Sequence, residues 1–443
     1  MDCTTLIDFR TDVYAAFTRA ADAMFDLADA LMTDTQAQSL IELALSPAFR
    51  RRWPSLYEAL EDGIIDAAAL RQAFVAAMPA VPTGKRPLLG IDASSLARPD
   101  AHTSADRTHV YQANTPHGAN PTTPGWSFSA VVHLDQPVSS WSYILDHQRI
   151  ASTSDPVTVG ASQLAALLPL LDVRPMVLLD RSYSRAPWLH ATATLPVDQF
   201  IRARSDQVLY RAAPERTGKP GRPRLDGARF QGRDASTHGT PDATATRTDA
   251  AGRTIGVAIW HHLHIRKARA VDLSVVRITR SFATDTKRDP RESWFWWHGE
   301  DLPPLAEVGT LYGHRFGQEH GYRFDKQDLL WDTARVRTPA QIERWTQIVA
   351  MVHHQIVVAR TLGIGERRPW ESTRRPASPQ QVRRAMAHHI RDLGTPAAPP
   401  QPRGKAPGRA VGASVKRAPR HPVIRKTSKT PKTKQKEVVN QRK

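Results

Sequence analysis

Residues 88–92 read LLGID and residues 175–180 read PMVLLD, and each of these short apolar runs ends in an aspartate. Apolar runs of about four to eight residues bounded by turn-forming residues are typical of buried strands. We therefore expect two buried strands, with Asp92 and Asp180 at their ends. An aspartate in such a place also caps helices and forms turns, so either acid alone is compatible with a structural role.

A third acid stands in a segment of mixed charge, residues 312–326, which read YGHRFGQEHGYRFDK. On a helix, with about 100° of rotation per residue, four of its side chains fall within roughly 60° of one another. These four are Tyr312, Arg315, Glu319 and Lys326. A carboxylate flanked by two cations suits a metal ion held beside a phosphodiester. The alternative is an exposed helix with ordinary ion pairs.

The chain is basic, and most of the excess charge stands near its end. The 443 residues carry a formal net charge of +18 and are 40% hydrophobic. Residues 401–443 hold 14 Lys and Arg against one acid, Glu437, so +13 of the +18 lies there and +5 elsewhere. This balance favours polyanionic partners, although such a tail can also be a solubilising arm.

Cysteine content and hydropathy exclude several classes of protein. Cys3 is the only cysteine, which excludes disulfide frameworks and cysteine-based zinc sites and is compatible with a reducing cytoplasm. The N-terminal sequence has no features of a signal peptide, and no apolar run is long enough to span a membrane. We therefore expect a cytoplasmic protein with no membrane partner.

The order of predicted elements indicates an α/β region between helices and a basic tail. Alanine-rich periodic segments predict a helical domain at residues 1–83. The two acid-ended strands and further helices predict a core in two parts, 84–203 and 303–393. Gly/Pro-rich segments and β-like runs predict a mostly β insertion at 204–302. Few apolar residues and many Pro, Gly, Lys and Arg predict a disordered tail at 394–443.

The spacing Tyr-x2-Arg-x3-Glu-x6-Lys, present at Tyr312–Lys326, resembles the signature of one large group of DDE transposases from bacterial insertion sequences. The segments GIDASSLARPDA, with Asp92, and LLDRSYSRAPWL, with Asp180, are similar to that group's first and second acidic motifs. The resemblance covers roughly residues 85–365.

The resemblance implies a ribonuclease-H-like catalytic core, which is a mixed five-stranded sheet flanked by helices. Asp92 would lie on its first strand, Asp180 at the end of its fourth, and Glu319 on a helix after an inserted β domain. These three acids would be catalytic and would hold two Mg²⁺ or Mn²⁺ ions. Tyr312, Arg315 and Lys326 would contact DNA phosphates or, for Tyr312, orient the helix.

The implied function is cut-and-paste DNA transposition, by metal-dependent cleavage and strand transfer at the ends of an insertion sequence. Its partners would be double-stranded transposon ends and target DNA, with at least a dimer during synapsis, in the cytoplasm and on the nucleoid. Excision through a hairpin is a further implication. Two alternatives stay open: a ribonuclease-H-like nuclease without joining activity, and an inactive, domesticated DNA-binding protein.

Two further segments invite a DNA-binding interpretation. Trp294, Trp296 and Trp297 cluster upstream of the signature, and Trp296 could stack on a base flipped out of the duplex. The alternative is that the cluster packs the insertion on the core. Residues 219–224 read KPGRPR, and Arg222 stands in a Gly-Arg-Pro core similar to minor-groove-binding peptides. A basic loop that contacts phosphates is the alternative there.

Overall fold

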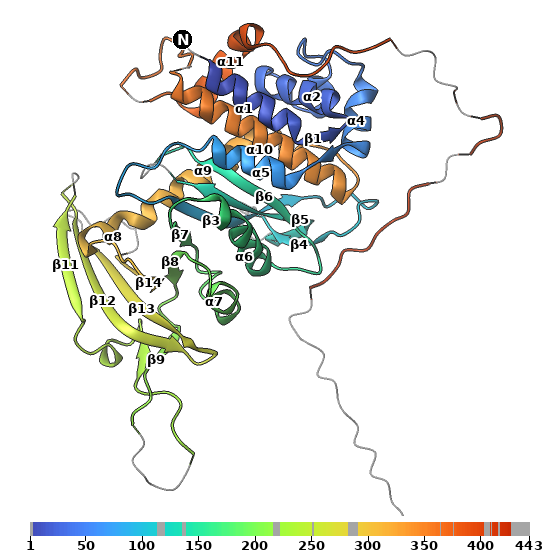
Figure 1. Ribbon diagram of the computed structural model, residues 1–443. Helices are drawn as coiled ribbons and strands as arrows, with labels where there is room; N and C mark the ends of the chain where they lie inside the picture. The colour runs from blue at the N-terminus through green and yellow to red at the C-terminus, as the bar shows by residue number, and fades with distance from the viewer. Residues whose placement is uncertain are drawn as a thin grey trace, which may run out of the picture.

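One large mixed sheet with helices on both faces forms the body of the protein (Figure 1). The computed structural model describes residues 3–112, 120–134, 139–215, 222–249, 252–281, 291–363, 365–374, 376–402, 408, 410–414 and 417–426. The α/β class expected from the sequence is confirmed. No helix in these ranges is long and apolar enough to cross a bilayer.

The central five strands run in the spatial order β6-β5-β3-β7-β8. Their bounds are Leu88–Ala97 (β3), Thr122–His133 (β5), Tyr143–Ile150 (β6), Met176–Leu179 (β7) and Asp198–Ala203 (β8). The first three in sequence pair antiparallel, whereas β7 and β8 run parallel to β3. The short β4 (Thr108–Tyr111) pairs with β5. The sequence did not predict β6, whose middle residues are polar.

Successive side chains of a strand point to opposite faces of the sheet, and helices cover both faces of the central strands. Leu89, Ile91 and Leu179 share one buried cluster with α6 (Pro156–Leu167) and α7 (Ala186–Thr192). Leu178 and Phe200 share the other cluster with α10 (Pro339–Thr361). Figure 1 shows α6 and α7 on one side of the strands and α10 on the other.

Helices from both ends of the chain form the layer on the α10 side. They are α1 (Thr4–Ala15), α2 (Ala21–Thr33), α3 (Leu40–Leu43), α4 (Trp53–Asp62), α5 (Ala67–Ala76), α10 and α11 (Pro379–Leu393). The bounds of α10 and α11 follow from their sequences, because Thr338 and Ser378 each form a capping box with a glutamine. The N-terminal helices thus share one core with the C-terminal ones, and the division into domains stays a prediction.

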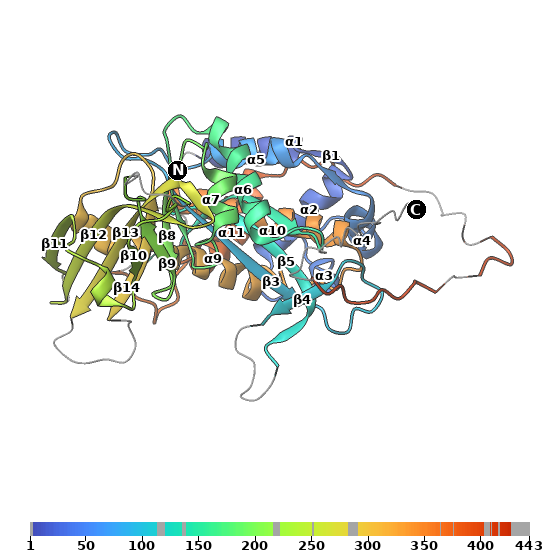
Figure 2. The same cartoon turned by 90° about the horizontal axis from the view of Figure 1, so that it is seen from below.

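The strands of residues 204–302 continue the same sheet. They are β9 (Val208–Arg211), β10 (Arg229–Gln231), β11 (Ala243–Thr248), β12 (Thr254–Ile265), β13 (Ala268–Ser281) and β14 (Glu292–His298). Because β14 pairs with β8, these strands join the central five. Figures 1 and 2 show β11, β12 and β13 at the opposite side of the molecule from α1, α2 and α4.

The C-terminal tail, residues 394–443, is where the sequence predicts disorder. Two described parts of this range make defined contacts with the rest of the chain. The backbone N–H of Ala398 donates to Asp22. Ile424 forms a parallel bridge with Thr108 of the edge strand β4, and its N–H donates to the Arg107 carbonyl at 2.7 Å. Backbone pairing with an edge strand can order a segment of low hydrophobicity. Residues 427–443 lie outside the described residues.

Candidate active site

Strand register brings Asp92 and Asp180 to neighbouring positions on one face of the sheet. Ile91 pairs with Leu179, and Leu179 pairs with Ile201. The next position on each strand is therefore Asp92, Asp180 and Arg202. Since Ile91, Leu179 and Ile201 face the α6 side, their successors face the opposite side. Asp92 is in the middle of β3 rather than at its end, which corrects the expected strand boundary.

The signature segment is helical but is not one continuous α-helix. The helix α8 (Leu305–Leu311) is followed by a 3₁₀ turn over Tyr312–Arg315 and then by α9 (Phe316–Gln327). Four spaced residues therefore do not share a single helical face as predicted, because the 3₁₀ turn is wound more tightly. Tyr312 and Arg315 lie in the turn, and Glu319 and Lys326 lie in α9.

Close packing of α9 comes from two glycines spaced four residues apart. A Cβ atom on Gly317 would lie 2.6 Å from the Trp141 carbonyl oxygen, and one on Gly321 would lie 2.6 Å from Ser142 Oγ. On the strand side, a Cβ on Gly90 would lie 2.6 Å from Oε1 of Gln318. The absence of side chains at these positions lets α9 lie close to β3 and to the segment before β6.

Arg315 is the direct link between the signature and the central strand. Its Nη2 atom lies 2.8 Å from Asp92 Oδ2, and its Nη1 donates to Tyr312 Oη at 3.1 Å. The Arg315 side chain is 5% exposed and that of Asp92 is 24% exposed. Burial by itself lowers the pKa of Arg315, but Asp92 and Tyr312 outweigh it, so its pKa is raised. Arg315 therefore stays charged.

The charges that act on Asp92 include those of the two other predicted acids, Asp180 and Glu319. Burial raises the pKa of Asp92, and the nearby charges of Asp180 and Glu319 raise it further, while Arg315 opposes them. Glu319 itself is exposed at the rim, one turn after Arg315. Asp180 and Glu319 thus both act on the Asp92 carboxylate.

Lys326 and Tyr322 hold the other end of α9 on the same strand. The Nζ atom of Lys326 donates to the Ser95 carbonyl at 2.8 Å, and Tyr322 Oη donates to the Asp92 carbonyl at 2.8 Å. Burial lowers the pKa of Lys326, and its ammonium lies 5.6 Å from the centre of the Trp331 ring. Lys326 therefore lies beside β3, three residues beyond Asp92.

Asp180 also has the local role that its position allows. Its Oδ1 atom accepts a hydrogen bond from the Ser182 backbone N–H at 2.9 Å. This contact is the turn-forming alternative considered for an aspartate after a strand. It uses one carboxylate oxygen, and the structure gives Oδ2 no hydrogen-bond partner among the described residues.

Arg202 is a site residue that sequence reasoning missed. Its guanidinium carbon lies 5.7 Å from the centre of the Tyr312 ring, and that of Arg315 lies 5.6 Å from the same centre. Arg202 is half-buried, and the structure gives it no carboxylate partner among the described residues. No motif marked it, because only the register of β7 and β8 aligns it with Asp180.

Two predicted DNA-contacting residues lie elsewhere. Trp296 is 2% exposed and packs among apolar residues such as Ile201 on the α6 side of the sheet, and Trp294 and Trp297 are also buried. The packing alternative thus describes all three tryptophans in this structure, and Trp296 presents no free face to a base. Arg222 is exposed, on an irregular segment between β9 and β10. Of the KPGRPR segment, residues 219–221 lie outside the described residues.

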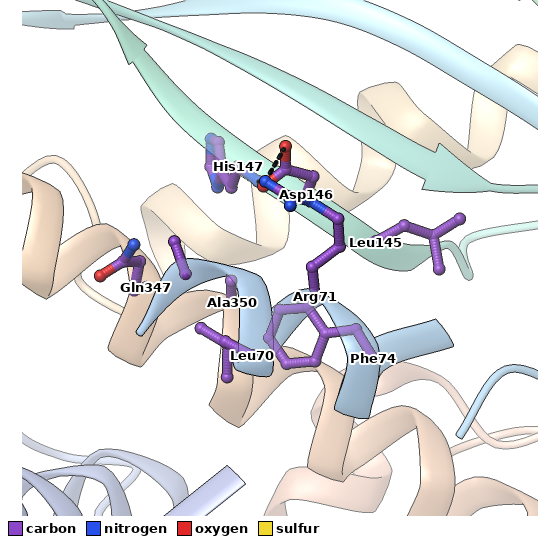
Figure 3. A pocket seen from close by; sticks show the side chains of 9 residues that line it. Leu70, Arg71, Phe74, Leu145, Asp146, His147, Gln347 and Ala350 are labelled. Carbon is purple, nitrogen blue, oxygen red and sulfur yellow. Dashed lines mark hydrogen bonds and ion pairs between the residues drawn. The ribbon is translucent and has the colours of Figure 1, made fainter. Parts of the chain in front are cut away.

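A small cavity under α5 is too small for a substrate. It encloses about 10 Å³, enough for one water molecule. Figure 3 shows Arg71 of α5 pointing to Asp146 of β6, with Nη2 and Oδ2 3.3 Å apart. A second cavity, of about 180 Å³, lies between α9 and the start of α11. Neither of these two cavities is lined by Asp92, Asp180 or Glu319.

Comparison with protein families places the chain in one superfamily. A family model for DDE superfamily endonucleases matches residues 12–262, more than half of the chain. This chain belongs to the DDE superfamily endonucleases. The matched range contains Asp92 and Asp180 and ends before the signature segment. No curated protein matches the chain.

Membership of the DDE superfamily endonucleases implies a DNA substrate and a nuclease that works with divalent metal ions. The chemistry of the donor set fits such ions, because three carboxylates supply the hard oxygen ligands that Mg²⁺ prefers. Within the described ranges, however, no three His, Cys, Asp or Glu side chains are close enough together to form a metal site. The Arg315 guanidinium lies against Asp92 at this place.

Proposed function

We propose that the protein is a DDE transposase of the insertion-sequence group with the Tyr-x2-Arg-x3-Glu-x6-Lys signature. The proposal includes a ribonuclease-H-like core, formed by the strands β3, β5, β6, β7 and β8. Their spatial order and directions support it. The single observation that carries the functional proposal is the contact of Arg315 with Asp92, because it joins the signature to the first acidic motif.

In this proposal Asp92, Asp180 and Glu319 hold two Mg²⁺ or Mn²⁺ ions. Such ions, when bound, activate the attacking oxygen and stabilise the leaving oxygen of a phosphodiester. The negative charges of Asp180 and Glu319 act on Asp92, and a bound cation would offset the repulsion among these acids. Arg315 pairs with Asp92, and we infer that a DNA phosphate would share this guanidinium.

The cations of the site divide the phosphate contacts among them. Arg315 and Arg202 flank the Tyr312 ring, so these two guanidinia would contact phosphates on either side of it. The Lys326 ammonium donates one N–H to the Ser95 carbonyl, and its two other N–H groups could donate to DNA phosphates. Tyr312 would fix the orientation of the Arg315 guanidinium, because its hydroxyl oxygen accepts a hydrogen bond from Arg315 Nη1.

Substitution of the three acids tests this assignment. We expect Asp92→Asn, Asp180→Asn and Glu319→Gln each to retain binding of the element's ends and to lose strand cleavage in Mg²⁺. A matched control is Glu307→Gln, an exposed acid on the preceding helix α8, which should cleave normally. Cleavage that persists in any of the three acid variants would overturn the role of that acid.

The joining step needs a separate assay. With pre-cut ends and a supercoiled target, a transposase should form strand-transfer products, and at least two protein copies should be present in the joined complex. Cleavage without such products would favour the nuclease alternative. Binding of ends without either reaction would favour the inactive DNA-binding alternative.

A further inference from the structure

A basic surface lies at the β12–β13 turn, away from the acids of the candidate site. It is formed by this turn and by the segment that leads into β10. The described residues 209–215, 222–228 and 263–270 contain six Lys or Arg and two acids, Glu215 and Asp226, and so carry +4. The six cations are Arg211, Arg222, Arg224, Arg266, Lys267 and Arg269.

Asp226 organises this surface. Its carboxylate accepts from Arg269 Nε at 2.7 Å, from Arg266 Nε at 3.1 Å and lies 3.1 Å from His264 Nε2. The Asp226 side chain is 12% exposed, whereas that of Arg266 is 61% exposed. The shielded Asp226 carboxylate therefore holds the guanidinium groups of Arg266 and Arg269 through their Nε atoms. Other N–H groups of these two side chains remain available toward solvent.

The neighbouring cations have no such counter-charge. Arg222, Arg224 and Lys267 are exposed, and the structure gives their side chains no carboxylate partner among the described residues. The Arg266 guanidinium also lies 4.6 Å from the centre of the Tyr210 ring, which restricts its orientation. Cations that are fixed in place and outnumber the acids suit a repeating anion better than a single small one.

We propose that this surface, the basic hairpin tip, binds the phosphate backbone of duplex DNA beside the segment that is cleaved. The inference rests on the proposed function, since the tip would contact the same DNA that the candidate active site would cleave. Arg202 and Tyr210 are eight residues apart, so their Cα atoms are at most about 30 Å apart. That span corresponds to about nine base pairs. The tip would therefore contact DNA within about nine base pairs of the acids.

Charge-neutralising substitutions test the proposal in a variant that does not cleave. In an Asp180→Asn background, Arg222→Gln, Arg224→Gln and Lys267→Gln together should weaken binding of a 40-bp duplex about tenfold or more. The slope of log affinity against log salt should fall by about 2 to 3, since each lost phosphate contact removes about 0.9. Binding is measured without divalent ions, so failure of the catalytic assignment does not affect it.

A matched control removes the same charge elsewhere. Arg19, Arg52 and Lys85 are exposed in or next to the N-terminal helical region, and Arg19→Gln, Arg52→Gln and Lys85→Gln together should change the slope by less than about 1. Arg222→Lys and Arg224→Lys should retain the slope, because phosphate contact needs charge rather than shape here. Equal loss in the tip and control variants, or no loss in either, would overturn the proposal.

Discussion

Arg315 Nη2 and Asp92 Oδ2 lie 2.8 Å apart, which makes the signature segment and the central strand partners in one largely buried ion pair. Removal of one member of such a pair leaves a charge that is shielded from water and uncompensated. The pair therefore has consequences for stability as well as for catalysis, and the two can be measured separately.

Arg315→Gln should lower the rate of DNA cleavage about 100-fold, the effect typical of losing one charged donor at a reacting centre. It should also lower the free energy of unfolding by about 3 kcal/mol, because Asp92 loses its counter-charge. Denaturant unfolding of Arg315→Gln, Asp92→Asn and the double variant gives the coupling. Arg323→Gln, on an exposed position of the same helix, is the control. Additive effects of the two substitutions would contradict an energetic pair.

Gly317→Ala should shift α9 and lower cleavage while DNA binding is retained. The new Cβ would lie 2.6 Å from a backbone oxygen, Trp141 O, which cannot rotate away. We expect a loss of about 1 to 3 kcal/mol in the free energy of unfolding. Gly313→Ala is the control, since nothing lies within 4 Å of its added Cβ. Equal stability of the two variants would show that the glycine does not set the distance between α9 and its neighbours.

His147 should make the protein sensitive to acid. Burial lowers the pKa of this histidine to about 3, and the structure gives neither ring nitrogen a hydrogen-bond partner among the described residues. In the unfolded chain this histidine binds a proton at higher pH than in the folded protein. Its contribution to the free energy of unfolding is therefore unchanged above the unfolded pKa of about 6.5 and decreases as the pH falls below it. Between pH 7.5 and pH 5 this loss is about 2 kcal/mol.

His147→Leu should remove that loss, as measured by urea unfolding at the two pH values. Phe128 and Trp331 already pack on the ring, so an apolar replacement keeps the packing. His109→Leu, at an exposed histidine, should leave the pH dependence of the parent protein unchanged. An unchanged dependence in His147→Leu would mean that other groups cause the acid sensitivity.

Ile424→Pro should release the tail from the sheet edge. Proline has no N–H, so the 2.7 Å bond to the Arg107 carbonyl is lost. Amide exchange of β4 residues and tryptic cleavage after Arg425 should both accelerate. Val411→Pro is the control, because Val411 is fully exposed and the structure gives it no contact among the described residues. Equal cleavage rates in both variants would indicate that the tail is not held at β4.

Much of the fold could be predicted from local sequence. The helices α10 and α11 begin at capping boxes that Thr338 and Ser378 form with glutamines, and these are local sequence patterns. Strand β7 followed from its short uninterrupted apolar run, a pattern typical of a buried strand. Strand β6 could not be predicted in this way, because its polar residues Asp146 and His147 are buried by partners distant in sequence, Arg71 and Trp331.

By itself the sequence determined which residue types are available for chemistry: three acids, two of them after apolar runs, and a spaced set of cations. Tertiary structure alone decided which of them meet. Register between parallel strands aligned Arg202 with Asp180, and the close approach of a glycine-containing helix brought Arg315 to Asp92. It also buried the tryptophans that the sequence offered to DNA. Local patterns encode propensity and periodicity, whereas pairing between distant segments depends on how the whole chain packs.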